Sequence, residues 1–167
     1  LSADVDAAAL TQELLAGLTT THSDVRIDRP GDVVAPAYGL VGSIQLYTRC
    51  GEEEAVARAV AGKDVAQPMV ETLPIDSTSI MGWVAEHREP LCIHDLNAAP
   101  WVRIYQPLYA DLRMRSELAV PLVGASGRLE GVLNLESPAV GAFNDQDSLL
   151  LQSLATQAVV AIQEARL

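Results

Sequence analysis

The sequence predicts a single α+β domain, because segments with strand periodicity and segments with helix periodicity both occur along its 167 residues. The stretches "SELAVPLV" and "LEGVLNLESP" read as two strands, and the glycine-containing connection "GASGR" between them is typical of an antiparallel hairpin. Directly after them, "FNDQDSLLLQSLATQAVVAIQEARL" has the spacing of one long helix. The length suits one domain with its own apolar core.

The first half of the chain alternates between clear and ambiguous patterns. Apolar residues at helical spacing predict a helix over 3–18, and two prolines among charged residues predict a loop over 19–38. Alternation of apolar and polar residues predicts a strand over 39–49. The following "EEEAVARAVAGKD" has the Glu and Ala content of a helix but also alternates, and its position just after Cys50 and Gly51 favours a strand.

The middle of the chain predicts one helix, one short strand and an irregular segment. In 77–89, hydroxyl residues can cap a helix whose apolar face begins at Ile80 and Met81, and Pro90 ends it. The stretch "LCIHDL" is typical of a short strand, and 97–115 predicts one or two short irregular helices. In the long helix near the end of the chain, we expect Asn144 or Asp145 as the N-cap, Asp147 in the first turn and Arg166 in the last.

Composition excludes several classes of partner. With 22 acidic against 11 basic residues the net charge is −11, which argues against binding to nucleic acid or to an anionic membrane surface. The sequence has no apolar run of the roughly 20 residues that cross a bilayer. The chain has neither a starting Met nor a visible signal peptide, so we expect a cytoplasmic segment of a longer protein. Two cysteines are too few for a disulfide framework, although a pair between Cys50 and Cys92 stays possible from sequence.

Cys92, His94 and Asp95 lie within four positions, and side chains of these types occur in metal sites and in sites with a thiol nucleophile. On a strand, Cys92 and His94 would share one face and Asp95 the other. A metal site would need further soft ligands, and the sequence has no CxxC or HExxH pattern, so we expect no metal centre. Cys92 is interpreted as a small buried hydrophobic residue; the alternative is a nucleophile that uses His94 as its base.

Large aromatic side chains gather around the irregular segment, in a protein with few aromatics elsewhere. They are Trp83, Trp101, Tyr105 and Tyr109, with Arg103, Arg113 and Arg115 interleaved. One interpretation is a loop held in place by aromatic anchors, and the other is the wall of a small-molecule cavity. The sequence has no GxGxxG pattern, no Walker-type Gly-Lys-Ser and no GxSxG elbow, so nucleotide and serine-hydrolase chemistry are without support.

Three stretches together resemble a GAF domain: "SIMGWVAEHREPLCIHDL", "RSELAVPLVGASGRLEGVLNLESP" and the long helical stretch that begins at "FNDQD". The resemblance is strong over residues 77–167 and rests on element order alone over 1–76. It implies one GAF-like domain over residues 1–167, with the sheet and pocket segments in 39–143 and a signalling helix in 144–167. The implied fold is a GAF/PAS-like central antiparallel sheet with the N- and C-terminal helices on one face. Short helices and loops would close a pocket on the other face.

The resemblance also bears on ligands. Methionine sulfoxide reductase members carry cysteines near the Gly-Trp helix and before the "SELAVPL" strand, where this chain has none. Bilin-carrying members place a Cys-His pair in the segment that corresponds to 97–115, which contains neither residue. Of the cyclic-nucleotide motif, Asn134, Phe143 and Asp147 match, but Leu135 and Ser148 replace its Lys and its last acid. We therefore expect neither a bilin nor a cyclic nucleotide, and no other cofactor is implied.

The function that the resemblance implies is a small-molecule sensor of signal transduction. We expect it to regulate a histidine kinase of a two-component system, or a similar output, and to have no enzymatic activity itself. The alternatives are a ligand-free dimerisation module and an enzyme using Cys92 and His94. We expect a homodimer through the terminal helices, because the last helix is apolar over more than one face. The expected ligand-binding residues are Trp83, His94, Trp101, Tyr105, Tyr109, Arg113 and Arg115.

Overall fold

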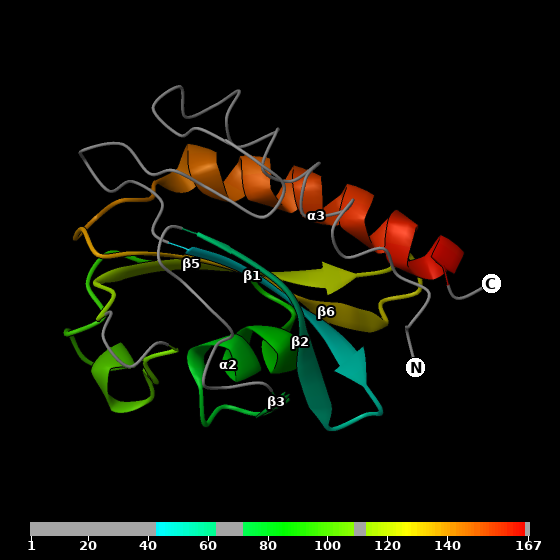
Figure 1. Ribbon diagram of the computed structural model, residues 1–167, viewed down its shortest axis with the longest axis horizontal. Coiled ribbons are helices and arrows are strands. Elements are labelled where there is room, and N and C mark those ends of the chain that lie inside the picture. Colours follow the sequence, from blue (N-terminus) through cyan, green and yellow to red (C-terminus); the bar gives the residue numbers. More distant parts are fainter. Residues whose placement is uncertain (1–42, 63–71, 109–112, 166–167) are drawn as a thin grey trace.

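A six-stranded antiparallel sheet with helices on both faces is the core of the computed structural model, which describes residues 43–62, 72–108 and 113–165 (Figure 1). The strands lie in the order β3-β2-β1-β6-β5-β4. Their bounds are β1 Ser43–Cys50, β2 Glu54–Gly62, β3 Thr72–Pro74, β4 Leu91–Ile93, β5 Ser116–Val123 and β6 Leu129–Ser137. The helices are α2 Ile80–His87, the 3₁₀ turn η1 Trp101–Arg103, and α3 Asp145–Ala165. The predicted helix over 3–18, the predicted loop over 19–38 and Arg166 lie outside the described residues.

Two hairpins give the sheet its centre, and both were predicted. The β1–β2 hairpin turns at Gly51, whose φ of +73° is the left-handed conformation that glycine adopts without strain. The segment after Gly51 is thus a strand, as its alternation indicated. The β5–β6 hairpin turns through residues 124–128, and its register places Glu117 opposite Glu136. Because side chains alternate along a strand, this register fixes which residues of β5 and β6 reach each face.

The α3 face of the sheet is a core of aliphatic side chains. Leu133 and Leu135 of β6, together with Leu118 of β5, are buried beneath the helix. Burying a leucine of this kind stabilises the fold by roughly 1.5–3 kcal/mol. At the start of α3, the Asn144 side chain accepts a hydrogen bond from the Asp147 N–H at 2.9 Å, and the Asp147 carboxylate accepts one from the Asn144 N–H at 2.9 Å. This reciprocal capping box confirms Asn144 as the N-cap.

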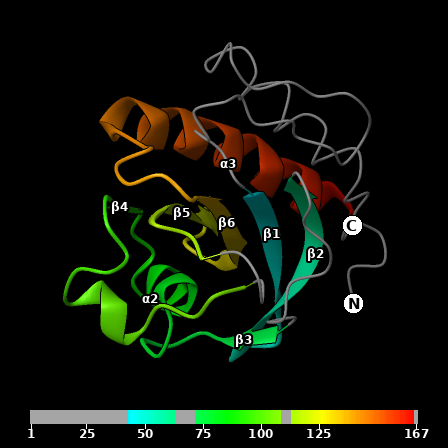
Figure 2. The same cartoon turned by 60° about the vertical axis from the view of Figure 1, so that its left-hand side comes forward.

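The opposite face of the sheet is covered by α2, by η1 and by the segments around them, as Figure 2 shows in a second view. Ser79 has an extended backbone, and its hydroxyl accepts a hydrogen bond from the Gly82 N–H at 3.0 Å, which starts α2 at the predicted place. The helix ends at Arg88, which has a positive φ of 55°. The α+β class, with the sheet between the long C-terminal helix and a cover of short elements, is confirmed for the described residues.

Two details differ from the sequence prediction. The strand predicted over "LCIHDL" ends at Ile93, because the Asp95 carboxylate accepts a hydrogen bond from the Asn97 N–H at 3.0 Å and turns the chain. His94 and Asp95 therefore lie outside the strand, and the expectation that Cys92 and His94 share one of its faces is wrong. The three-residue edge strand β3 had not been predicted. In the described ranges, no helix is long and apolar enough to cross a membrane.

Candidate functional site

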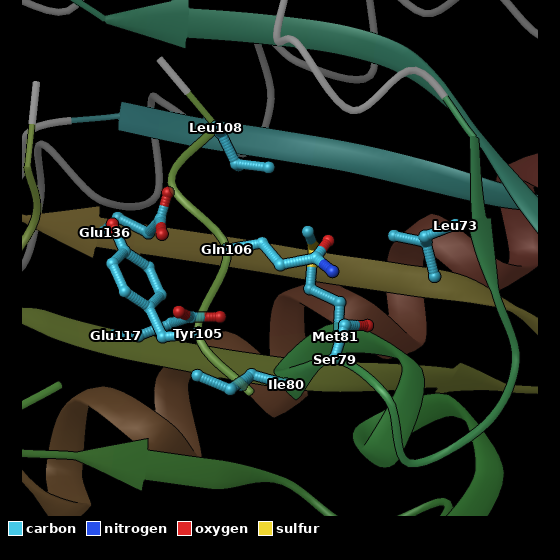
Figure 3. Close-up of a pocket in the computed structure, with 9 residues that line it drawn as sticks. All are labelled: Leu73, Ser79, Ile80, Met81, Tyr105, Gln106, Leu108, Glu117 and Glu136. Carbon is cyan, nitrogen blue, oxygen red and sulfur yellow. The ribbon is translucent and has the colours of Figure 1, made fainter. Parts of the chain in front are cut away.

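A small cavity lies between the sheet and its cover of short elements (Figure 3). Its walls come from β3, the start of α2, the segment after η1, and the paired strands β5 and β6. The lining residues are Leu73, Ser79, Ile80, Met81, Tyr105, Gln106, Leu108, Glu117 and Glu136. The cavity volume is about 20 Å³. That space holds roughly one ordered water, so in this state the cover closes tightly over the sheet.

Two glutamates form the acidic end of the cavity. Glu117 of β5 and Glu136 of β6 are directly opposite in the hairpin, are 2% and 1% exposed, and are hydrogen-bonded to each other through their side chains. Burial raises the pKa of Glu136 to about 8. Burial, reinforced by the charge of Glu136 and the hydrogen bond to it, also raises the pKa of Glu117 well above its usual value. Two adjacent carboxylates cannot both ionise cheaply in such a place, so the pair holds a proton at neutral pH.

Tyr105 lies beside the glutamate pair and belongs to the cover. Its hydroxyl oxygen accepts a hydrogen bond from the Met114 N–H at 3.3 Å, and its ring lies 5.6 Å from the guanidinium of Arg113. Burial, and then the nearby charge of Glu136, raise the pKa of the Tyr105 phenol. Tyr105 therefore stays neutral and can donate a hydrogen bond into the cavity.

Two buried acceptor atoms on the cavity face of β6 have no hydrogen-bond partner among the described residues. They are Glu136 Oε2 and Asn134 Oδ1. The amide nitrogen of Asn134 donates to Gln45 Oε1 of β1 at 2.8 Å, which fixes the orientation of the Asn134 side chain. An unsatisfied buried acceptor costs about 1–3 kcal/mol, so a donor that reached either atom would stabilise the protein.

Of the residues expected to bind a ligand, Tyr105 lines the cavity, whereas Trp83 and Trp101 lie outside its wall. Trp83 is stacked on His87, with ring centroids 4.1 Å apart, and meets Trp101 edge to face at 5.9 Å. Both tryptophans are partly buried and pack against the core between the sheet and α2. His94 is exposed, and its backbone carbonyl accepts a hydrogen bond from the Gly141 N–H.

The expected arginines are held by polar partners on the cover. Arg115 Nη2 lies 3.3 Å from Asp95 Oδ1, and Arg113 Nη2 donates to Asn97 Oδ1 at 2.8 Å. The hydrogen bond from the Asn97 N–H, together with the Arg115 guanidinium, keeps the pKa of Asp95 below its usual value. Tyr109 lies outside the described residues.

Cys92 is half-buried on the α3 side of the sheet and packs against the aliphatic core there. Its thiol donates to the Phe143 carbonyl at 3.5 Å. Burial raises the pKa of the Cys92 thiol, and the charges of Asp145 and Asp147 raise it further. These conditions disfavour the thiolate. Within the part of the chain that the structure describes, no three His, Cys, Asp or Glu side chains are placed to hold a metal ion.

The glutamate pair was not predicted from the sequence, although a signal for it was present. "SELAVPL" and "LNLES" each place one acid at a strand position that alternates with buried leucines. A five-residue hairpin connection brings those two acids opposite each other. Two acids that face each other across a hairpin are unfavourable on an ordinary surface, which makes the pair a signal of special surroundings.

Comparison with known proteins places this geometry in a family. The family model of the GAF domain matches residues 33–163. The chain belongs to the GAF domain family. Among curated proteins none matches the sequence significantly.

Solved structures share the GAF fold with this chain at low sequence identity. A type II free methionine-R-sulfoxide reductase from Thermoplasma acidophilum has a TM-score of 0.68 at 15% identity, over 95% of this chain and 93% of that one. A protein described as a GAF sensor, from Burkholderia vietnamiensis, has a TM-score of 0.66 at 24% identity, over 94% and 85%. The GAF domain of an Acinetobacter phosphoenolpyruvate-protein phosphotransferase has a TM-score of 0.63 at 19% identity, over 75% and 74%.

The reductases correct one expectation. We expected a GAF domain of this kind to have no enzymatic activity, and that expectation is wrong because free methionine-R-sulfoxide reductases are enzymes with this fold. The chain thus belongs to a family of signalling and ligand-binding modules, and enzymes also have this fold.

Proposed function

We propose that this GAF domain is a sensor that binds a small molecule in the cavity beneath Tyr105. The supporting observation is the buried glutamate pair at the cavity wall. Burying two carboxyl groups without a cation lowers stability, and carboxyls with strongly raised pKa values in a cavity are typical of binding and catalytic sites. A purely structural core would be more stable with apolar residues at these two positions.

In this proposal, α3 carries the binding state to an output domain. The helix packs on β5 and β6, the strands whose other face holds the glutamates. The space open to water is only about 20 Å³, so a ligand larger than a few atoms must displace part of the cover, most simply the segment that carries Tyr105. We place the domain in a cytoplasmic sensor histidine kinase of a two-component system, or in a similar regulatory protein.

The experiment that tests the proposal is native mass spectrometry of the purified domain, followed by a thermal-shift screen with small metabolites. A bound ligand should appear as a defined added mass and should raise the melting temperature as its concentration exceeds its Kd. Both effects should be lost in Leu73→Trp, which fills the cavity from β3. They should persist in Val140→Trp, which enlarges an exposed apolar residue outside the cavity in the same way.

Circular dichroism must show that both variants are folded. The proposal would be contradicted if the purified domain carried no added mass and if no compound raised its melting temperature in a way that Leu73→Trp abolishes.

A second candidate function, homodimerisation through the terminal helices, is favoured by the outer face of α3. Leu149 and Val160 are 68% and 50% exposed and lie about three turns apart, so they share one side of the helix. Large exposed apolar residues in such a row are typical of an interaction surface. Sedimentation at tens of micromolar should show a dimer that Leu149→Glu dissociates and that Val102→Glu, at an exposed valine of η1, leaves intact. A monomer before any substitution would contradict it.

A further inference from the structure

We propose that the ligand of this cavity carries a cationic hydrogen-bond donor, an ammonium or guanidinium group, that binds against Glu117 and Glu136. The inference rests on the proposed sensor function and names the chemical class of its ligand. It follows from three properties of the described residues around the cavity: unpaired acceptors at its acidic end, no basic side chain among those that line it, and apolar side chains on the remaining walls.

Two buried acceptor atoms on this face of β6 have no donor among the described residues. Glu136 is 1% exposed and lines the cavity, yet its Oε2 has no donor among the described residues. Asn134 stands two positions earlier on β6, so it shares the cavity face of the strand, and its Oδ1 also lacks a donor there. Each such atom destabilises the empty protein, and a ligand N–H would satisfy it.

Charge points to the same class of ligand. Among the described residues, the cavity wall includes two glutamates and no lysine, arginine or histidine. Of the described cations near this end, Arg113 lies over the ring of Tyr105 and donates to Asn97, and Arg115, two positions before Glu117, pairs with Asp95. An anionic ligand would meet the carboxyls without a compensating cation, whereas an ammonium or guanidinium group would form a charge-assisted hydrogen bond. Leu73, Ile80 and Met81 form apolar walls, which suits a short hydrocarbon chain behind the cation.

A proton should leave when such a cation binds. Among the described residues, Tyr105 of the cover faces the pair and stays neutral, Arg113 lies beyond its ring, and Arg115, two positions before Glu117, is paired with Asp95. Because the carboxyl pair holds its proton at neutral pH, that proton competes with the cation. Affinity should therefore rise with pH from about 6 to about 8, toward the tenfold per pH unit that one displaced proton gives.

The test uses three probes of equal chain length on the folded domain: n-propylammonium chloride, 1-propanol and sodium propionate. The sequence has 3 methionines, so the methyl spectrum of protein labelled at methionine is simple, and Met81 reports on the cavity. We expect n-propylammonium to shift the Met81 methyl signal saturably, and more tightly at higher pH. The double variant Glu117→Gln, Glu136→Gln should weaken that binding by about 10- to 100-fold. Glu89→Gln, the same change at an exposed site, should leave it unaltered.

The outcomes separate the inference from the proposed function. If 1-propanol or propionate binds as tightly as the ammonium, or if the double variant binds the ammonium normally, the ligand class is wrong while the sensor proposal stands. If no probe shifts Met81, the identity of any co-purifying ligand decides: a cation supports the inference and any other ligand overturns it. If no probe binds and no ligand co-purifies, both fail.

Discussion

The buried glutamate pair should make the domain less stable as pH rises through the neutral range. In the folded protein the pair keeps a proton, because the pKa of Glu136 is raised to about 8 and that of Glu117 is raised as well. In the unfolded chain both carboxyls ionise near their ordinary value, about 4.3. Above that value the unfolded state binds fewer protons than the folded state, so the free energy of unfolding must fall with increasing pH.

The size of the effect follows from the number of protons retained. Each retained proton lowers the free energy of unfolding by about 1.4 kcal/mol per pH unit, so a pair that keeps at least one proton loses about 3 kcal/mol or more of stability between pH values of about 5.5 and 7.5. Because a domain of this size is stable by only roughly 5–15 kcal/mol, urea titrations at both pH values should resolve such a loss. Glu117→Gln, Glu136→Gln removes both titrating groups and should give a nearly flat profile.

Glu89→Gln is the control, since it removes one acidic residue at an exposed position and should keep the slope of the unmodified domain. All three proteins have the same histidines, so the difference between their slopes isolates the pair. A free energy of unfolding that is flat or rising over this range in the unmodified domain would refute the reasoning. So would a double variant that keeps the full slope.

Three further predictions concern local structure. Gly82→Ala should cost about 1–3 kcal/mol in urea unfolding because its methyl group would meet backbone carbonyls, whereas Gly124→Ala meets only the tip of a flexible side chain and should cost less; equal losses would argue against this packing. Asn144→Ala should lower the free energy of unfolding by about 1 kcal/mol through loss of the cap of α3, and an unchanged urea midpoint would speak against the capping box. In a Cys50→Ser background, a thiol reagent at neutral pH should label Cys92 much more slowly in folded than in unfolded protein, and equal rates would show that its raised pKa and burial are misjudged.

The sequence predicted best the elements whose structure is determined by residues close together along the chain. The β5–β6 hairpin follows from two alternating runs and a short glycine connection, and α3 from its helical period and its Asn144 cap. These signals depend on neighbours in sequence, and tertiary packing did not overturn them. β3, with three residues, is too short to show a period of its own.

The site was harder to predict because its surroundings are set by tertiary structure. Along β6, Asn134 and Glu136 alternate with leucines, a pattern that ordinarily predicts polar residues facing water. Here α2 and the segment of Tyr105 cover that face, so the same pattern buries them. The irregular segment has no period, so the sequence could gather Trp101 and Tyr105 in one place but could not tell which ring would reach the cavity.

Consecutive residues of β6 face two different environments on opposite sides of the sheet. Leu135 belongs to the aliphatic layer under α3, and its immediate neighbour Glu136 belongs to the acidic end of the cavity. No relay of side chains is needed between the two sides, because a shift of the β6 backbone moves both at once. The effects of substitutions along this strand should therefore alternate with a period of two residues. Substitutions of residues on the α3 face would change the packing of the helix, and substitutions on the other face would change which ligands the cavity binds.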